Sequence, residues 1–219
     1  MIPIEEALEK ILSYVDVLQQ EEKPILDIMG QVLCEDVYSD INVPPLDNSA
    51  MDGYAVQSAS TAGAVQSSPA ILKVTGEVAA GSISDRVVEP GTAIRIMTGA
   101  PIPTGADTVV QFENTDEETR SSSGRLLDEI GVLHETPADL NIRRAGEDIK
   151  KGDLVLKKGI VIRPQEVGLL ASLGRASVKV IRRPVVAVLA TGDELVNVGE
   201  PLPAGKIYNS NTFSMASQV

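Results

Sequence analysis

The sequence predicts mixed α and β structure arranged in more than one domain. Three observations support this fold class: a helical apolar stripe at the N-terminus, short apolar runs cut by Gly and Pro through the middle, and one continuous apolar run near the C-terminus. A chain of 219 residues has room for one large or two modest domains. We expect a β domain over 44–140, inserted into a small β-rich domain that is built from 20–43 and 141–180.

The N-terminal segment, 1–19, is typical of an amphipathic helix, which we expect over 3–19. Pro3 suits a first helical turn, and the acidic residues that follow it suit the positive end of the helix dipole. The apolar residues share one helical face: Ile4, Ala7, Leu8, Ile11, Leu12, Val15 and Leu18. A second, shorter helix is expected over 25–33, although Gly30 lies within it.

The middle of the chain is expected to be β structure. Short apolar stretches at 71–74, 92–97 and 108–112 predict strands joined by turns. The polar segment 114–124 predicts a solvated hairpin tip or loop. Turn-rich β patterning resumes at 141, and because neither flank of the inserted domain is long enough to bury a core alone, we expect the two flanks to fold together.

The C-terminal part predicts the start of a parallel α/β domain. A helix is expected over 163–174 and a strand over 178–181, followed by the apolar run 185–190, which is typical of a strand buried on both faces. A further helix is expected to begin near 209–211. Because no second parallel strand is expected before Val219, we expect 181–219 to be the truncated start of this domain. We expect 184–219 to be poorly ordered or stabilised by a neighbouring chain.

Composition excludes several classes of function. There are 19 Lys and Arg against 31 Asp and Glu, a net charge of −12, which argues against a broad nucleic-acid surface. One Cys allows neither an internal disulfide nor a Cys-based zinc site, and one His means that a Ser-His-Asp relay would have to use His134. No apolar run approaches the roughly 20 residues of a membrane span, and no secretory signal is evident, so we expect no membrane partner and a cytoplasmic location.

Four polar clusters are candidates for chemistry. In the first, over 44–56, the carboxylates of Asp47 and Asp52 and the amide of Asn48 can hold a hard cation such as Mg²⁺, or can simply make turn hydrogen bonds. In the second, over 95–107, Thr98 and the backbone near Gly99 can bind an oxyanion, or can form a rigid connection between strands.

The remaining two clusters leave similar alternatives. Over 141–148, Arg143 and Arg144 beside Glu147 and Asp148 can bind phosphate and metal together, or can pair with each other on the surface. The fourth cluster, 191–194, follows the expected buried strand, which is where open α/β sheets bind ligands; the alternative is a helix or turn cap.

Taken together, these clusters resemble the MoeA family of molybdopterin molybdenumtransferases, which is related to the E domain of gephyrin. The resemblance rests on four strings that occur in the family's order: PPLDNSAMDGYAV at 44–56, PGTAIRIMTGAPIP with GADTVV at 90–110, RRAGED at 143–148 and TGDEL at 191–195. A match of thirteen residues is far more specific than a bare Gly-rich turn, and it favours the functional interpretation of each cluster.

The resemblance implies a reaction and its partners. Adenylylated molybdopterin and molybdate are the expected substrates, with Mg²⁺ as cofactor, AMP released and the molybdenum cofactor as product. The family's functional residues fall on Asp52, Thr98, Asp148 and Glu194, which we expect to be catalytic, with Asp52 and Glu194 holding the metal. Because both substrates are anions, we expect Arg95, Arg143 and Arg144 to offset their charge. Asp47, Ser49 and Asp193, which lie in the matching strings, are further expected substrate contacts.

The resemblance also implies an architecture. Members form elongated homodimers, with the active cleft between the β domain of one subunit and the molybdopterin-binding α/β domain of the other. The first helix is expected to pack with that α/β domain. Family members continue well beyond the point that corresponds to Val219, so we expect the full-length protein to be the enzyme and this chain alone to be inactive. The alternative is a non-catalytic scaffold or assembly module like some relatives of gephyrin.

Overall fold

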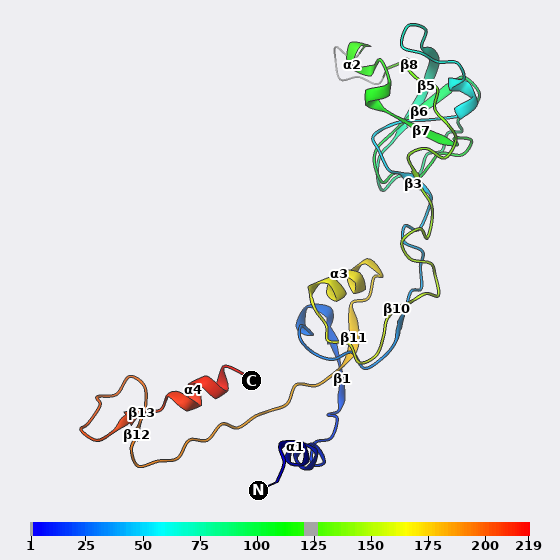
Figure 1. The fold of residues 1–219 in the computed structure, drawn as a ribbon. Helices are drawn as coiled ribbons and strands as arrows, with labels where there is room; N and C mark the ends of the chain where they lie inside the picture. Colours follow the sequence, from blue (N-terminus) through cyan, green and yellow to red (C-terminus); the bar gives the residue numbers. More distant parts are fainter. Residues whose placement is uncertain (1, 121–126) are drawn as a thin grey trace.

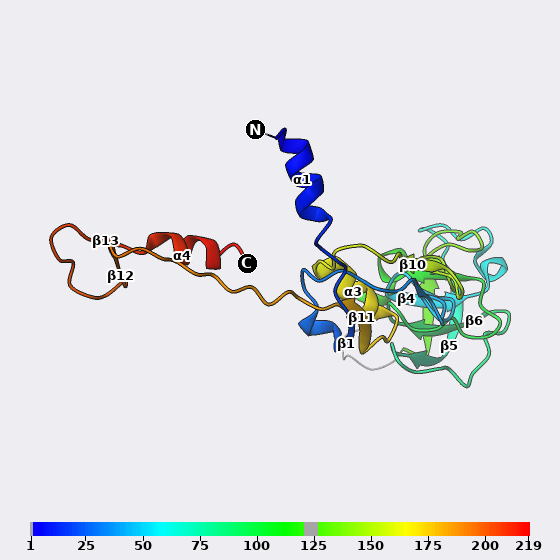
Figure 2. The ribbon, with the colours of Figure 1, turned by 90° about the horizontal axis from the view of Figure 1, so that it is seen from below.

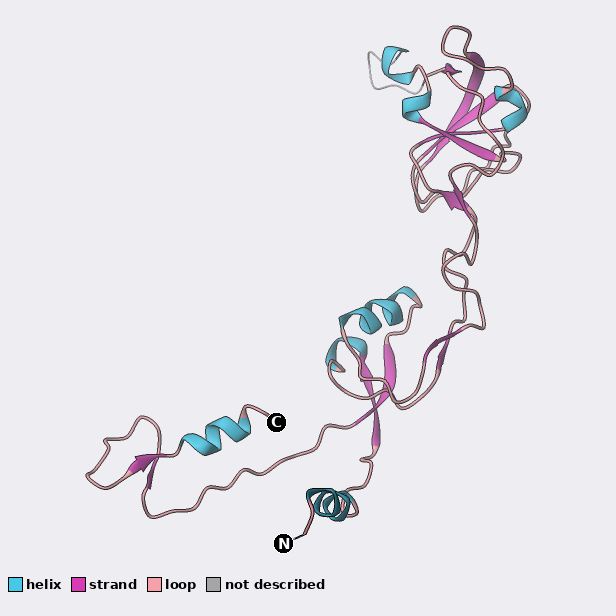
Figure 3. Ribbon diagram, viewed as in Figure 1, coloured by secondary structure: helices cyan, strands magenta, loops and turns pink. Residues whose placement is uncertain are grey.

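The computed structural model, which describes residues 2–120 and 127–219, confirms the mixed α and β class (Figures 1 and 3). Its largest element is a curled five-stranded sheet in the order β7-β4-β6-β5-β8. Strands β5 and β6 run parallel, whereas the other neighbours are antiparallel. The strands are β4 (Gly53–Val56), β5 (Ala70–Val78), β6 (Thr92–Ile96), β7 (Thr108–Gln111) and β8 (Glu129–Val132).

Both faces of this sheet are covered by apolar side chains. Successive residues of a strand point to opposite faces, so Tyr54 and Val56 join one buried cluster while Ala55 joins another. The same alternation on β6 places Ala93 with Tyr54, and Ile94 with Ala55. β4, an inner strand between β7 and β6, is buried along its whole length.

Short helical turns border the sheet. They are η2 (Ser58–Thr61), η3 (Phe112–Asn114) and the one-turn helix α2 (Glu117–Arg120). The loop expected over 114–124 is therefore partly wrong, because its first half coils into η3 and α2. Its last part, 121–124, lies outside the described residues.

A smaller group of elements has its own core. Strands β1 (Gln20–Pro24) and β11 (Ser177–Ile181) pair antiparallel, as do β2 (Val37–Tyr38) and β10 (Leu154–Leu156), and helix α3 (Pro164–Ser172) covers them. The fully buried residues of this small core include Ile28, Leu33, Ile162, Leu170 and Val180. Residues from both flanks of the large sheet therefore share one core.

The helix expected over 25–33 is wrong. Only a 3₁₀ turn, η1 (Ile25–Asp27), forms there. Gly30 adopts a φ of +77°, which is a left-handed conformation that ends regular helix. The chain then turns so that Leu33 can enter the small core, and this tertiary packing overrides the local helical preference.

Two antiparallel segments, 43–49 and 141–149, connect the small core to the large sheet (Figure 1). Val43 and Ile149 exchange backbone hydrogen bonds of 2.8 and 3.1 Å at the lower end of this connection. At its upper end β3 (Asn48–Ser49) pairs with β9 (Ile142–Arg143). The domain limits stay a prediction, but this connection is where the chain crosses between the two cores.

The two ends of the chain extend away from these cores (Figure 2). Helix α1 (Ile4–Leu12) is shorter than the expected 3–19 and buries none of its residues, so its packing against the α/β domain stays a prediction. Within the described residues, no helix is long and apolar enough to cross a membrane.

The strand expected over 185–190 is wrong. Val185 is 92% and Leu189 89% exposed, because no described strand lies beside this run to pair with it. The next residues form a short parallel pair that the sequence did not indicate, β12 (Leu195–Val196) with β13 (Ile207–Tyr208). Helix α4 (Ser210–Ala216) follows, at the expected place, and the Asn209 side chain caps it by accepting a hydrogen bond from the Thr212 amide.

Gly53 shows how tightly the large sheet is assembled. A Cβ at this position would lie 2.0 Å from the carbonyl oxygen of Val110 on β7, which no side chain tolerates. We therefore expect Gly53→Ala to force β4 and β7 apart and to lower the free energy of unfolding by about 1–3 kcal/mol, the usual scale of overpacking. Urea denaturation of the purified chain measures this.

Gly168 provides the matched control. It lies within α3, and a Cβ there would meet nothing within 4 Å. Gly168→Ala is expected to raise the free energy of unfolding by ~0.5–1 kcal/mol, because alanine loses less backbone entropy in a helix. Equal stability of the two variants would contradict the assigned role of Gly53.

Candidate functional site

Asp52 and Thr98 meet at the ends of two inner strands of the large sheet, β4 and β6. Asp52 directly precedes β4, and Thr98 follows the end of β6 by two residues. Because these strands are antiparallel neighbours with Gly53 opposite Ile96, the start of one lies beside the end of the other. Asp52 Oδ1 accepts hydrogen bonds from the Thr98 amide at 2.7 Å and from its hydroxyl at 2.8 Å.

These contacts fix the charge of Asp52. The Thr98 amide lowers the pKa of this carboxyl most, the Thr98 hydroxyl lowers it further, and the charge of Arg95 adds a smaller contribution. Asp52 is therefore an ionised, exposed carboxylate at neutral pH. Since its folded-state pKa is depressed, any stability that it contributes is present above the ordinary aspartate pKa of ~4 and is lost as the pH falls through the folded value.

Asp47 forms a second cluster at the connection between the two cores. Its Oδ1 accepts a hydrogen bond of 2.7 Å from the Ala145 amide, and its Oδ2 pairs with Arg144 Nη1 at 2.5 Å. The amide, followed by the guanidinium, lowers the pKa of Asp47. Arg144 also pairs with Asp139, so one cation holds two carboxylates from different turns.

Arg143 and Asp148 make a separate ion pair of 2.6 Å beside this cluster. Both side chains are about half exposed, at 44% and 51%, and exposed pairs contribute little to stability. Either side chain can therefore leave this ion pair and bind a ligand instead at a small cost in free energy. In this structure Arg143 and Asp148 thus pair with each other on the surface, which is one of the two alternatives stated for the 141–148 cluster.

The first two sequence clusters lie side by side. Residues 47–49 run along 99–102, with the Ser49 amide bonded to the Ala100 carbonyl at 2.9 Å and the Gly99 amide bonded to the Ser49 carbonyl at 2.8 Å. The Ser49 side chain is 1% exposed, and its hydroxyl donates to the carbonyl of Met51 at 2.5 Å. Ser49 thus shapes the turn that leads into Asp52, and the structure places its hydroxyl away from the surface.

Asp193 and Glu194 lie apart from all of these residues. They belong to the extended C-terminal segment, beside β12 and far from β3 in Figure 1. Across the described ranges, no group of three or more His, Cys, Asp or Glu side chains is arranged to hold a metal. Asp52 next to the Thr98 hydroxyl fits the part of a Mg²⁺ site that one carboxylate supplies, since Mg²⁺ takes one or two carboxylates and completes its shell with water and substrate phosphates.

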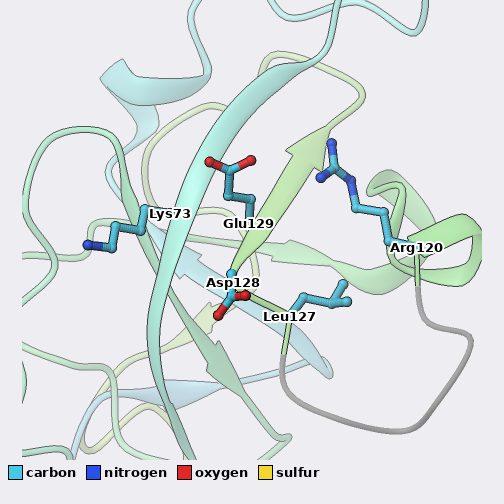
Figure 4. Close-up of a pocket in the computed structure, with 5 residues that line it drawn as sticks. All are labelled: Lys73, Arg120, Leu127, Asp128 and Glu129. Atoms are coloured by element: carbon cyan, nitrogen blue, oxygen red, sulfur yellow. The ribbon is translucent and has the colours of Figure 1, made fainter.

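An open hollow of about 390 Å³ lies beside β5 and the edge strand β8 of the large sheet (Figure 4). It is lined by Lys73, Arg120, Leu127, Asp128 and Glu129. The Lys73 side chain points away from Arg120, so the two cations do not converge on one point. None of the expected site residues borders this hollow, so we do not assign the candidate site to it.

A family model described as the MoeA N-terminal region, domains I and II, matches residues 2–174. This chain belongs to the MoeA family. Molybdopterin molybdenumtransferases from Staphylococcus aureus strain Mu50 and Bacillus subtilis strain 168 are 41% and 39% identical to it, over 96% and 99% of this chain and 48% and 50% of their own lengths. The chain thus spans about half the length of the curated relatives that it matches.

A solved structure supports the fold of this MoeA chain. The crystal structure of a molybdopterin biosynthesis MoeA protein from Pyrococcus horikoshii OT3 superposes with a TM-score of 0.83 at 35% identity. The match covers 100% of this chain and 56% of that one. The mixed α and β fold with its curled sheet therefore matches that of an experimentally determined member of the family.

Sequence reasoning missed some residues around the site in this MoeA chain. Asp139, which pairs with Arg144, adopts a φ of +64°, and Asn141 one of +58°. Asp and Asn are the residues that tolerate this conformation best, so a turn was predictable here but the ion pair was not. Glu117 was likewise not singled out, although it holds Arg95 at 3.1 Å.

The Asp52–Thr98 contact predicts a measurable shift. Thr98→Val keeps the size of the side chain and the backbone amide but removes the hydroxyl donor, so we expect the pKa of Asp52 to rise toward the ordinary aspartate value. Thr98→Ser retains the hydroxyl and should leave this pKa near that of the wild type. Carboxyl ¹³C NMR titration measures both, and an unchanged Asp52 titration in the valine variant would refute the contact.

Proposed function

We propose that the protein carrying this chain inserts molybdenum from molybdate into adenylylated molybdopterin, releasing AMP and forming the molybdenum cofactor. One observation supports this most strongly: relatives named molybdopterin molybdenumtransferase are about 40% identical along nearly the whole chain. A further such enzyme from Mycobacterium tuberculosis is 40% identical over 90% of it. Membership of the MoeA family supports the same reaction class.

In this proposal Asp52 is the carboxylate at the reacting centre. Asp52 and Glu194 would hold Mg²⁺, which when bound supplies Lewis-acid polarisation of the phosphoanhydride. Thr98 keeps Asp52 ionised and fixes its orientation through the two hydrogen bonds at 2.7 and 2.8 Å. Asp148 pairs with Arg143 at 2.6 Å, and in this proposal the carboxylate and the cation would face the same ligand.

The arginines would offset the charge of the two anionic substrates. The chain carries a net charge of −12, so a polyanion needs local cations to approach it. Arg143 and Arg144 are 44% and 53% exposed and are held by carboxylates at the surface. Substrate phosphate would replace Asp47, Asp139 or Asp148 as their partner, and the planar guanidinium suits that exchange.

A homodimer would complete the site. Within the described residues, Asp193 and Glu194 lie on a segment that extends away from the large sheet (Figure 1). We propose that the α/β segment of one subunit faces the large sheet of the other, which brings these acids to Asp52. The proposed reaction takes place in the cytoplasm.

The central test replaces Asp52 with alanine in the protein that carries this chain. Molybdenum insertion, followed with adenylylated molybdopterin, molybdate and Mg²⁺, is expected to fall by roughly 100-fold or more, the scale for losing an electrostatic group at a reacting centre. The thermal midpoint should change little, because the Asp52 side chain is exposed.

Asp85→Ala is the matched control, since Asp85 is also an exposed aspartate but lies outside the candidate site. It should keep wild-type turnover. Wild-type turnover of Asp52→Ala at saturating Mg²⁺ would rule out the proposed role of Asp52.

A further inference from the structure

We propose that Arg95 is a positioning residue for Asp52, seated on Phe112 and held by Glu117, and that it does not contact the substrate. This replaces the substrate-binding role expected for Arg95. The inference rests on the proposed function only in taking Asp52 as the carboxylate at the reacting centre.

Internal contacts already occupy the Arg95 guanidinium. Its Cζ lies 4.5 Å from the centre of the Phe112 ring, which is a cation–π arrangement. Its Nε and Nη2 both donate to Glu117 Oε1, at 3.2 and 3.1 Å. Only 23% of the Arg95 side chain and 17% of the Glu117 side chain are exposed, so this pair is largely withdrawn from solvent.

Phe112 connects this pair to Asp52. Its backbone amide donates to the carbonyl oxygen of Asp52 at 3.2 Å. Its ring meets the ring of Tyr54 edge-on, with centroids 5.7 Å apart and planes at 70°. Phe112 therefore contacts the chain at Asp52 through its backbone amide and at Tyr54, two residues later, through its ring, and Arg95 lies over that ring.

Arg95 also lies on the strand that delivers Thr98. It faces Tyr54 across the β4–β6 pair and precedes Thr98 by three residues. The main chain of Asp52 is thus held through Phe112, and its carboxylate through Thr98. Arg95 is linked to both supports, to Phe112 through its side chain and to Thr98 through the chain that leaves β6.

The buried polar atoms around the Arg95–Glu117 pair make Arg95 hard to replace. Among the described residues, the Tyr54 hydroxyl and Glu117 Oε2 are buried without a hydrogen-bond partner. Removing Arg95 would leave the Glu117 carboxylate without its cation beside the Tyr54 hydroxyl, which is costly in a poorly solvated site. A full truncation therefore risks unfolding, and the conservative variants Arg95→Lys and Glu117→Gln are the informative ones.

The first measurement is amide exchange in this chain. Lysine keeps the charge but loses the flat face and the second donor, so Arg95→Lys should speed exchange of the Thr98 and Phe112 amides by about tenfold, as expected for local loosening. The Ile94 amide in the middle of β6 should be unchanged. Glu117→Gln should give the same pattern.

Arg120 supplies the matched control. It pairs with Asp116 at 2.6 Å in the same short segment as Glu117, so Arg120→Lys makes the same chemical change nearby and should alter neither the Thr98 nor the Phe112 amide. Equal acceleration at Ile94, Thr98 and Phe112 in Arg95→Lys would show general destabilisation and overturn the proposal. Unchanged exchange at Thr98 and Phe112 would also overturn it.

The second measurement separates positioning from substrate binding in the protein that carries this chain. Arg95→Lys should lower kcat for molybdenum insertion about tenfold while KM for adenylylated molybdopterin stays within about twofold. A raised KM with unchanged kcat would restore Arg95 as a substrate contact. If the wild-type protein showed no insertion activity, the proposed function would fail, but the amide-exchange result would still decide whether Arg95 supports Asp52.

Discussion

The pairing of β4 with β6 on one side and β7 on the other is the interaction on which the candidate site depends. Gly53 allows β4 to approach the Val110 carbonyl so closely that a single added carbon would lie 2.0 Å from it. Asp52 begins this strand, and its carboxylate reaches the loop that leaves β6. The position of a solvent-exposed acid is thus set by packing inside the sheet.

Local pattern located the polar clusters but left each with a structural alternative, and the resemblance to the MoeA family was what favoured function. Asp52 and Thr98 stand in Gly- and Pro-rich turns at the ends of apolar runs, and the structure brings those turns together. What joins them is strand order, and a single sequence does not reveal that β4 lies between β6 and β7. Glu194 is the converse case, because its motif is equally clear but the described residues place it apart from Asp52.

The errors in the elements have physical causes. At 25–33 the apolar spacing suits a helix, but Gly30 turns left-handed and Leu33 is drawn into the small core. At 185–190 the apolar run is typical of a buried strand, yet a strand forms only where a neighbour supplies hydrogen bonds. Local pattern therefore located the apolar segments but did not reveal what each one packs against, and that packing decided whether a helix or a strand formed.

The connection through 43–49 and 141–149 has a consequence for how such a molecule arises. The chain enters and leaves the large sheet through these two paired segments, and Val43 pairs with Ile149 where they begin and end. When the ends of a folded unit lie side by side, a host loop can accept the unit without stretching. The large sheet can thus be viewed as a domain inserted into one turn of the domain that contains the small core. Replacing the inserted domain by another would leave the chain path of the small core unchanged.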